Sequence, residues 1–266
     1  MKCQHNLNIL YHHTGNIEKN WTIVNGLRLH SLVSRNPLFE ERTPVVFVHG
    51  LAVSNRYLIP AMSEISKSRQ VFAPDLPGWG ESAKPRHVFN IAELADTLAL
   101  WMQAMKIERA VVIGQSFGCQ VAAEFAVRHA SMVERIILAA PTFDRRARSA
   151  FRHFWRLLID APNEPFSLVL LALRDFLKFG IRREIKTLKF ALRDKIEDKL
   201  PQIRIPALVI RGELDTVVPE LWAREVAGLF PDGRLVTIKG GTHGVNYQMS
   251  QEFAAAVLEF LNDRIE

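Results

Sequence analysis

One serine lies in a short glycine-flanked pattern that suits nucleophilic chemistry. Ser116 occurs in Gly114-Gln-Ser-Phe-Gly118, after the apolar run 110–113 and before a helical pattern over 117–128. A G-x-S-x-G sequence between a strand and a helix is typical of a sharp turn that exposes the serine hydroxyl. The start of the helix adds partial positive charge and free N–H groups, which suit an oxyanion. Without these neighbours, the same pattern would fit an ordinary capping serine.

A serine becomes a good nucleophile only when a base removes its proton, and a histidine is the usual base. Among the nine histidines, His243 has the most suitable context, in Gly240-Gly-Thr-His-Gly244 between the apolar run 235–238 and the last helical pattern. Functional groups of a parallel sheet gather at the carboxyl ends of its strands, so this loop is expected to face Ser116. We expect seven others to be surface or capping residues: His5, His12, His13, His30, His87, His129 and His153.

The histidine needs an acid that orients it and stabilises its charged form. Asp215 lies in Gly212-Glu-Leu-Asp-Thr216, the loop after the apolar run 207–210. Glu213 is a rival with similar chemistry. We favour Asp215 because it lies further into the loop, just before the helical pattern that follows Pro219.

The elements that must position these residues alternate along the chain. Asn25-Gly26 between two apolar-rich runs predicts a hairpin over 21–33, because both central residues of a type I′ turn need positive φ. Strands are predicted at 45–48, 71–73, 110–113, 136–139, 207–210 and 235–238, and helices at 91–105, 117–128, 220–229 and 251–264. This alternation predicts an α/β fold with a mostly parallel sheet covered on both faces.

Residues 142–202 interrupt the rhythm with basic helical patterns and no strand-like run. We interpret them as a helical lid, inserted before the last two strands into a core formed by 1–141 and 203–266. From 142 to 200 there are 14 Lys and Arg against 8 Asp and Glu, which equals the whole excess of positive charge in the chain. A solvated helical face is the favoured interpretation, and a nucleic-acid or membrane-surface module is the alternative.

The composition is ordinary for a soluble globular protein, with 48% apolar and 23% charged residues. Residues 1–15 lack the apolar core of a signal peptide, and Cys3 and Cys119 are too few for a disulfide framework. These features predict a cytoplasmic protein without stable membrane insertion. No motif indicates nucleic-acid binding, a metal or another cofactor, and a homodimer is compatible with the sequence. Cys119 is expected to be a small buried side chain.

From residue 45 to its end the chain resembles the α/β-hydrolase superfamily, least so in the lid. The resemblance rests on His49-Gly50, Asp75-Leu-Pro-Gly-Trp-Gly-Glu-Ser82, the Ser116 turn, Asp215 and His243, in the chain order Ser, Asp, His. It implies a sheet of roughly eight strands. It also implies an oxyanion hole made by the backbone N–H groups of Leu51 and Phe117. In that family the histidine matching His49 fixes the oxyanion loop, and we expect Asp75 to organise a turn.

The serine narrows the chemistry, because haloalkane dehalogenases and epoxide hydrolases of this fold carry aspartate at the position of Ser116. We expect hydrolysis of an ester, thioester or lactone of a small to medium apolar acyl group, through an acyl-enzyme. The alternatives are C–C hydrolysis of a ring-fission product and a ligand-binding member without catalysis. Gly50-Leu-Ala-Val-Ser54 departs from the longer glycine-rich loop usual in C–C hydrolases.

We predict that the small-molecule substrate meets apolar side chains of the lid and of the loops that hold the acid and the base. Aromatic residues at helical spacing in the lid also fit core or lid-docking positions. The candidates are Phe143, Phe151, Phe154, Trp155, Val217 and Val245.

Overall fold

The chain enters its sheet through the predicted hairpin. In the computed structural model, which describes residues 17–263, β1 (Glu18–Val24) pairs antiparallel with β2 (Leu27–Ser34). Asn25 and Gly26 join them with φ of 47° and 76°, as a type I′ turn requires. The hairpin prediction is therefore confirmed, whereas Cys3 and the polar stretch 1–15 lie outside the described residues.

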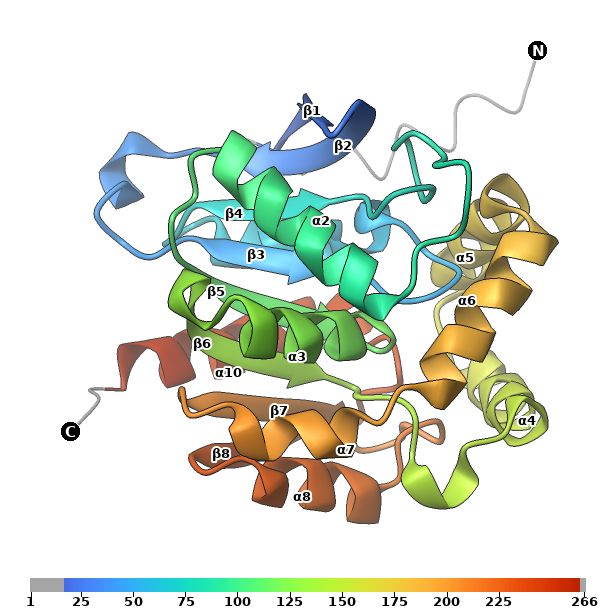
Figure 1. Ribbon diagram of the computed structural model, residues 1–266. Helices are drawn as coiled ribbons and strands as arrows, with labels where there is room; N and C mark the ends of the chain where they lie inside the picture. The colour runs from blue at the N-terminus through green and yellow to red at the C-terminus, as the bar shows by residue number, and fades with distance from the viewer. Residues whose placement is uncertain (1–16, 264–266) are drawn as a thin grey trace.

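The sheet has eight strands in the order β1-β2-β4-β3-β5-β6-β7-β8 (Figure 1). Only the two pairings made by β2 are antiparallel, and every other neighbouring pair is parallel. The predicted mostly parallel α/β sheet is thus confirmed. Its other strands are β3 (Val45–Val48), β4 (Val71–Pro74), β5 (Ala110–Gln115), β6 (Val133–Ala139), β7 (Ala207–Gly212) and β8 (Gly233–Ile238).

Helices cover both faces of the sheet, which explains why its strands read as continuous apolar runs. Along β3, Val46 and Val48 belong to one buried cluster, and Val45 and Phe47 belong to the other. The first cluster lies beneath α2 (Ile91–Ala104), α3 (Gly118–Arg128) and α8 (Glu220–Leu229). The second lies beneath α1 (Ile59–Ile65) and α10 (Ser250–Asn262), with α9 (Val245–Gln248) at its edge.

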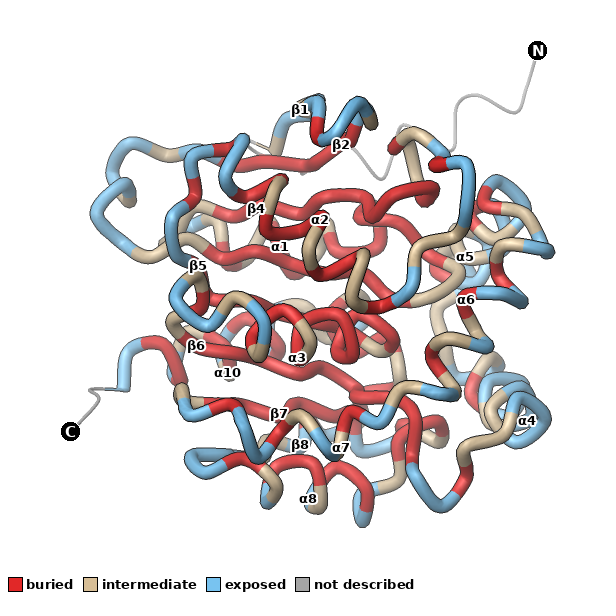
Figure 2. The backbone as a smooth tube through the Cα atoms, viewed as in Figure 1, coloured by how far each residue is buried: buried red, intermediate tan, exposed pale blue. Residues whose placement is uncertain are grey.

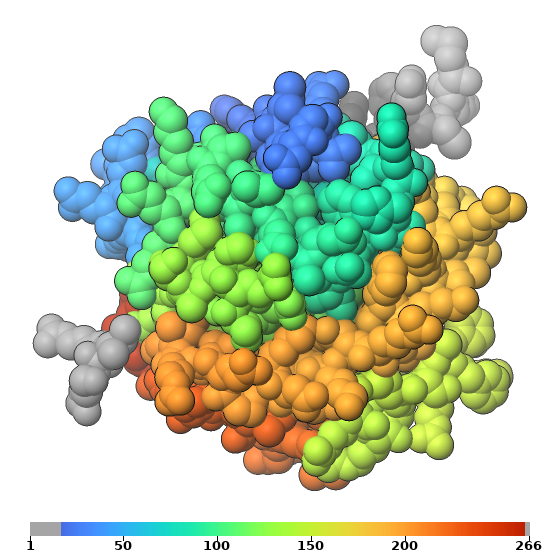
Figure 3. Space-filling model, in the orientation of Figure 1, coloured from blue at the N-terminus to red at the C-terminus, as the bar shows by residue number. Residues whose placement is uncertain are grey.

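Between β6 and β7 the chain forms helices and no strand, as expected for residues 142–202. The helices are α4 (Ala150–Asp160), α5 (Phe166–Phe179), α6 (Ile181–Arg193) and α7 (Ile196–Lys199). Figure 1 shows α4, α5 and α6 together on one side of the molecule, beyond the carboxyl ends of the parallel strands. Figure 2 shows the sheet buried and much of this side exposed. In Figure 3 the same segment, coloured yellow-green to gold, forms one edge of the molecular surface. We call residues 142–202 the lid.

Candidate active site

Ser116 occupies a strained turn between β5 and α3. Its φ is 53°, a conformation that costs a residue with a side chain roughly 1–3 kcal/mol. Its N–H donates to the carbonyl of Ala139 over 2.8 Å, which anchors the turn to β6. A Cβ added to Gly118 would lie 2.2 Å from the Val48 carbonyl oxygen, and one added to Gly114 would lie 2.5 Å from the Gly118 oxygen. Both glycines of the pattern are therefore required by close backbone packing.

The three residues selected from the sequence form one hydrogen-bonded chain. Ser116 Oγ lies 3.0 Å from His243 Nε2, and His243 Nδ1 lies 3.1 Å from Asp215 Oδ2. Because Nδ1 faces a carboxylate, it holds the ring proton, and Nε2 is left to accept a proton from the serine. Ser116 follows β5, Asp215 follows β7 and His243 follows β8, so the carboxyl ends of three strands bring them together.

Backbone N–H groups of the loop after β7 hold the Asp215 side chain in place. Its Oδ1 accepts the N–H groups of Val217 and Val218 at 2.8 and 2.9 Å, and its side chain is fully buried. Its rival Glu213 is exposed and accepts the N–H of Gly240 at 2.9 Å. Asp215, and not Glu213, is therefore the carboxylate that faces the histidine.

Burial by itself would lower the pKa of His243. The charge and hydrogen bond of Asp215 outweigh that effect, and Asp160 and Glu164 add to it, so the pKa rises to about 9. Such surroundings stabilise the imidazolium ion that would form if the ring took a proton from Ser116.

Two backbone donors are available beside the nucleophile. A Cβ added to Gly50 would lie 3.3 Å from the Cβ of Ser116, so this loop passes directly against the serine. Leu51 follows Gly50, and Phe117 follows Ser116. Within residues 17–263, neither the Leu51 N–H nor the Phe117 N–H has a hydrogen-bond partner. Unpaired N–H groups of this kind can stabilise an oxyanion.

His49 fixes the loop that leads to Leu51. Its Nδ1 donates to the Gly50 carbonyl over 2.8 Å, and its Nε2 accepts the Leu76 N–H at 3.0 Å. Burial lowers the pKa of His49, which favours the neutral ring that this pair of bonds needs. His49 lies between two backbone segments and makes no hydrogen bond to Ser116, in keeping with a structural residue.

Two further side chains connect the loops, and the sequence did not reveal them. Tyr57 accepts the Gly50 N–H at 3.2 Å and donates to Gln115 Oε1 at 2.5 Å. Gln115 Nε2 in turn donates to the His243 carbonyl at 3.1 Å. Gln115 occupies the second position of the glycine-flanked pattern, where any residue type is allowed. Its place next to Ser116 was therefore the one feature of the sequence that pointed to a role in the site. Nothing local marked Tyr57.

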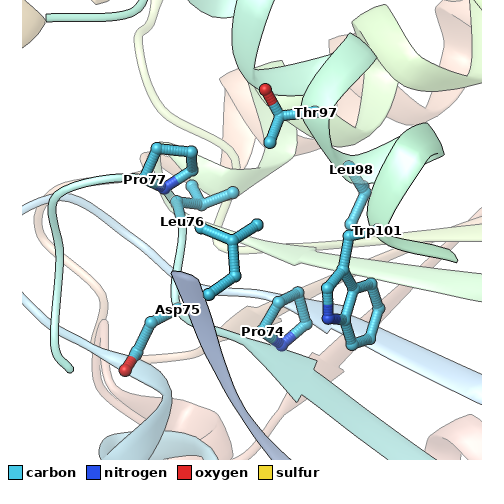
Figure 4. Close-up of a pocket in the computed structure, with 8 residues that line it drawn as sticks. Pro74, Asp75, Leu76, Pro77, Thr97, Leu98 and Trp101 are labelled. Atoms are coloured by element: carbon cyan, nitrogen blue, oxygen red, sulfur yellow. The ribbon is translucent and has the colours of Figure 1, made fainter. Parts of the chain in front are cut away.

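Asp75 organises a turn, as expected. Its two oxygens accept the N–H groups of Asn55 and Glu81 at 2.8 Å and contact His30 Nδ1 at 2.7 Å. His30 is buried on β2, so the expectation of a surface or capping residue was wrong for it. A recess of about 10 Å³, room for roughly one water molecule, lies beside Asp75. Figure 4 shows the recess between the end of β4 and α2, lined by Pro74, Leu76, Pro77, Thr97, Leu98 and Trp101 among others. The recess is lined by none of the three residues Ser116, His243 and Asp215, and it is too small for an acyl substrate.

The lid contacts both loops that hold the acid and the base. Asp160 Oδ1, at the end of α4, accepts the Thr216 N–H at 3.2 Å, and Glu164 Oε1 accepts the Gly244 N–H at 2.6 Å. Burial, together with the nearby charge of Asp160, raises the pKa of Glu164 to about 7. The lid is thus joined to the site by partly buried polar contacts.

His153 belongs to the site, although it was expected to be a surface or capping residue. Its ring centroid lies 4.3 Å from that of Phe143. Burial and the nearby positive charges of His243 and Arg156 lower the pKa of His153 to about 3. That expectation was wrong because helical spacing alone does not show which side of α4 faces the core.

The predicted substrate contacts divide into two groups. Phe143, Val217 and Val245 are buried near the loops of the site. Phe151, Phe154 and Trp155 are 69%, 56% and 49% exposed, on the side of α4 away from His153 and Asp160. These three aromatics therefore occupy neither a core position nor, in this structure, a buried pocket. Cys119 is buried, as expected, and burial raises its thiol pKa well above the usual range.

Two kinds of feature are absent from the described residues. Residues 17–263 contain no group of three or more His, Cys, Asp or Glu arranged to hold a metal ion. None of the helices in that range is long and apolar enough to cross a membrane.

Comparisons with known proteins agree with the geometry. A model of the alpha/beta hydrolase family matches residues 45–256. The AB hydrolase superfamily protein YisY of Bacillus subtilis (strain 168) is 24% identical over 246 residues, which cover 82% of this chain and 91% of that protein. The pimeloyl-[acyl-carrier protein] methyl ester esterase of Vibrio cholerae serotype O1 is 24% identical over 242 residues, covering 81% and 93%. The structure of the enol-lactonase from Burkholderia xenovorans LB400 superimposes with a TM-score of 0.74 at 24% identity, covering 92% and 100%, which shows the shared fold.

Proposed function

The chain belongs to the alpha/beta hydrolase family, and on that premise we propose that it is a serine hydrolase that cleaves a carboxylic ester through an acyl-enzyme. The observation that supports this most directly is the unbroken chain Ser116–His243–Asp215, with separations of 3.0 and 3.1 Å. A buried carboxylate, a histidine and a half-buried serine in this geometry suit acyl transfer.

The reaction divides into two halves. Ser116 Oγ attacks the ester carbonyl carbon while His243 Nε2 takes the hydroxyl proton, and the Leu51 and Phe117 N–H groups stabilise the oxyanion. The imidazolium then protonates the departing alkoxide, which leaves as an alcohol and yields the acyl-enzyme. In the second half, His243 removes a proton from water, the hydroxide attacks the acyl carbon, and Ser116 regains its proton as the acid leaves.

The proposed preference for an apolar acyl group rests on the side chains near the site. Phe143, Val217 and Val245 are apolar and buried there, which favours a small to medium hydrocarbon chain as the acyl group. The resemblance to a methyl ester esterase over most of both chains supports ester cleavage among the possible acyl transfers. Thioesters and lactones would use the same atoms.

A fluorophosphonate probe tests the nucleophile. We expect covalent labelling of Ser116 in the wild type, mapped by mass spectrometry, and no labelling of Ser116→Ala. Gly228→Ala is a matched small substitution, because a Cβ there meets no atom within 4 Å, and it should be labelled like the wild type. Folded wild-type protein that stays unlabelled would overturn the proposal.

A panel of p-nitrophenyl esters of graded acyl length then tests the substrate class. We expect turnover that peaks at short to medium chains and falls by at least about 10⁴-fold in Ser116→Ala. Equal inactivity of both proteins on every ester, with turnover of a ring-fission product by the wild type alone, would favour C–C hydrolysis instead. Tight binding of a ligand without turnover would favour a receptor.

A further inference from the structure

The lid exposes most of the large apolar side chains that face solvent in residues 17–263. Thirteen of the 18 such residues lie in α4, α5 and the first turns of α6. Monomeric proteins rarely expose large contiguous apolar patches without a partner. The thirteen exposed apolar residues of the lid are Phe151, Phe154, Trp155, Leu157, Leu158, Ile159, Phe166, Val169, Leu170, Leu173, Leu177, Ile181 and Ile185.

The exposed residues form stripes along the helices. On α5, Phe166, Val169, Leu170, Leu173 and Leu177 follow the spacing of a single helical face, opposite the buried face of the same helix. On α4, the aromatic rings pack on one another at the surface, with centroids 5.9 Å apart for Phe151 and Trp155 and 6.4 Å apart for Phe154 and Trp155. We call the exposed side chains of α4 and α5 the apolar lid face.

In the same helices, the acidic side chains are buried and the exposed charged side chains are basic. The three acidic residues of α4 to α6, Asp160, Asp175 and Glu184, are all buried. The exposed charged residues over 150–193 are all basic: Arg152, Arg174, Lys178, Arg182, Lys186, Lys189 and Arg193. The last six form no salt bridge within the described part of the chain. The solvated helical face expected from the sequence therefore holds the cations, together with an apolar surface that was not expected.

An apolar surface bordered by unpaired cations matches the outer layer of an anionic lipid membrane. Apolar side chains enter the boundary between headgroups and acyl chains, and each nearby Lys or Arg adds about 1 kcal/mol of attraction to anionic lipid. We propose that the apolar lid face docks reversibly on an anionic lipid surface.

A second copy of the chain is a poorer occupant. In a two-fold dimer the same surface patch contacts itself, which would bring the cations of both lids together. Nucleic acid would pair with the cations and stack on aromatic rings such as Trp155, but it would leave aliphatic side chains such as Leu170 and Leu173 uncovered. Anionic lipid satisfies both features of the face.

Docking in this orientation would turn the site toward the lipid, with the lid between them. The inner side of the lid contacts the acid and base loops through Asp160 and Glu164, whereas the outer side bears the apolar face. If the proposed ester hydrolysis holds, its substrates would include esters that dissolve in a bilayer. Docking itself does not depend on that function.

The test measures binding of the full chain to sucrose-loaded vesicles by sedimentation. We expect binding to vesicles of phosphatidylcholine mixed with phosphatidylglycerol, weaker binding to pure phosphatidylcholine, and a decline with salt. Arg182→Gln with Lys189→Gln should weaken binding about 30-fold, since two cations contribute roughly 1 kcal/mol each. Leu170→Glu with Leu173→Glu should abolish it. Leu221→Glu, at an exposed leucine of α8 outside the lid, is the matched control and should bind like the wild type.

Tryptophan fluorescence gives a second readout. Trp155 and Trp21 are the exposed tryptophans, and Trp79, Trp101 and Trp222 are buried. A blue shift on adding anionic vesicles should disappear in Trp155→Phe and persist in Trp21→Phe. Ser116→Ala should still bind, which separates this proposal from the hydrolase proposal.

Three results would overturn docking. The first is absence of sedimentation with anionic vesicles at low salt. The second is binding that is unchanged in Leu170→Glu with Leu173→Glu. The third is a wild-type dimer in light scattering that this double variant converts to a monomer, with no vesicle binding by either protein; the face would then be an interface between copies.

Discussion

At the scale of single residues, the surroundings of His243 decide how it can act as a base. Asp215 is held by two backbone N–H groups through one oxygen and contacts the ring through the other. Burial would disfavour the charged ring, and the carboxylate reverses that preference, so the pKa of His243 lies above its ordinary value. The histidine is thus prepared to hold the proton that Ser116 would release in the proposed reaction.

Replacing Asp215 by Asn should change both rate and pH dependence. A base works in its neutral form, so activity rises as pH increases through its pKa. Loss of the carboxylate lowers the pKa of His243, so the acid limb of the kcat/KM profile for a p-nitrophenyl ester should move to lower pH. The plateau should fall by about 10³–10⁴. Glu213→Gln, at the exposed rival, should leave the limb in place, and an unmoved limb in Asp215→Asn would rule out the assigned role.

At the scale of elements, the lid supports the loop that bears Leu51, the proposed oxyanion donor. Asp175 on α5 accepts a hydrogen bond from Ser54, and Phe179 stacks on Trp79 with ring centroids 4.0 Å apart. Glu184 on α6 is buried near the backbone of Ala52, and burial raises the pKa of Glu184 to about 8. Residues of two lid helices therefore pack against the segment around Leu51.

Glu184 should make the stability of the chain depend on pH. Its carboxyl holds a proton in the folded chain up to about pH 8 and loses it near pH 4.5 when unfolded, so the free energy of unfolding should fall as pH rises across that interval. Glu184→Gln has no proton to lose, so its stability relative to wild type should increase from pH 4.5 to 8 in urea titrations. The exposed Glu40→Gln serves as control and should change less. Parallel curves for Glu184→Gln and wild type would contradict this account.

At the scale of the whole molecule, a buried sheet carries a lid whose helices bury few of their residues. Helices α3 and α4 both have 11 residues. Eight residues of α3 are buried, whereas Asp160 alone is buried in α4. Figure 2 shows this difference between the layer around the sheet and the lid. Few buried apolar contacts mean a low free energy for local opening.

Hydrogen exchange followed by mass spectrometry should report that difference. Amides of α4 are expected to exchange at least about tenfold faster than those of α3, because opening α4 exposes little additional apolar surface. The two helices have the same length, so α3 is an internal control. Equal protection of both helices would show that the lid unfolds only with the core.

Local features of the sequence were enough to predict the sheet, its flanking helices and the set Ser116, Asp215 and His243. Each depends on neighbours in the chain: apolar runs buried on both faces, glycines at close backbone approaches, and loops that follow strands. Gly114 and Gly118 are required here because the strand turns sharply into the helix and the neighbouring backbone leaves no room for a Cβ.

Only the tertiary structure decided which side of each lid helix faces the core. The spacing of Phe151, Phe154 and Trp155 defines a stripe, but a stripe alone has no direction relative to the rest of the molecule. The polar contacts of Asp160 and Glu164 set that direction, which turned the aromatics outward and brought His153 to the site. The link from Tyr57 through Gln115 to His243 likewise joins residues far apart in the chain, so it arises only from the folded arrangement of the loops.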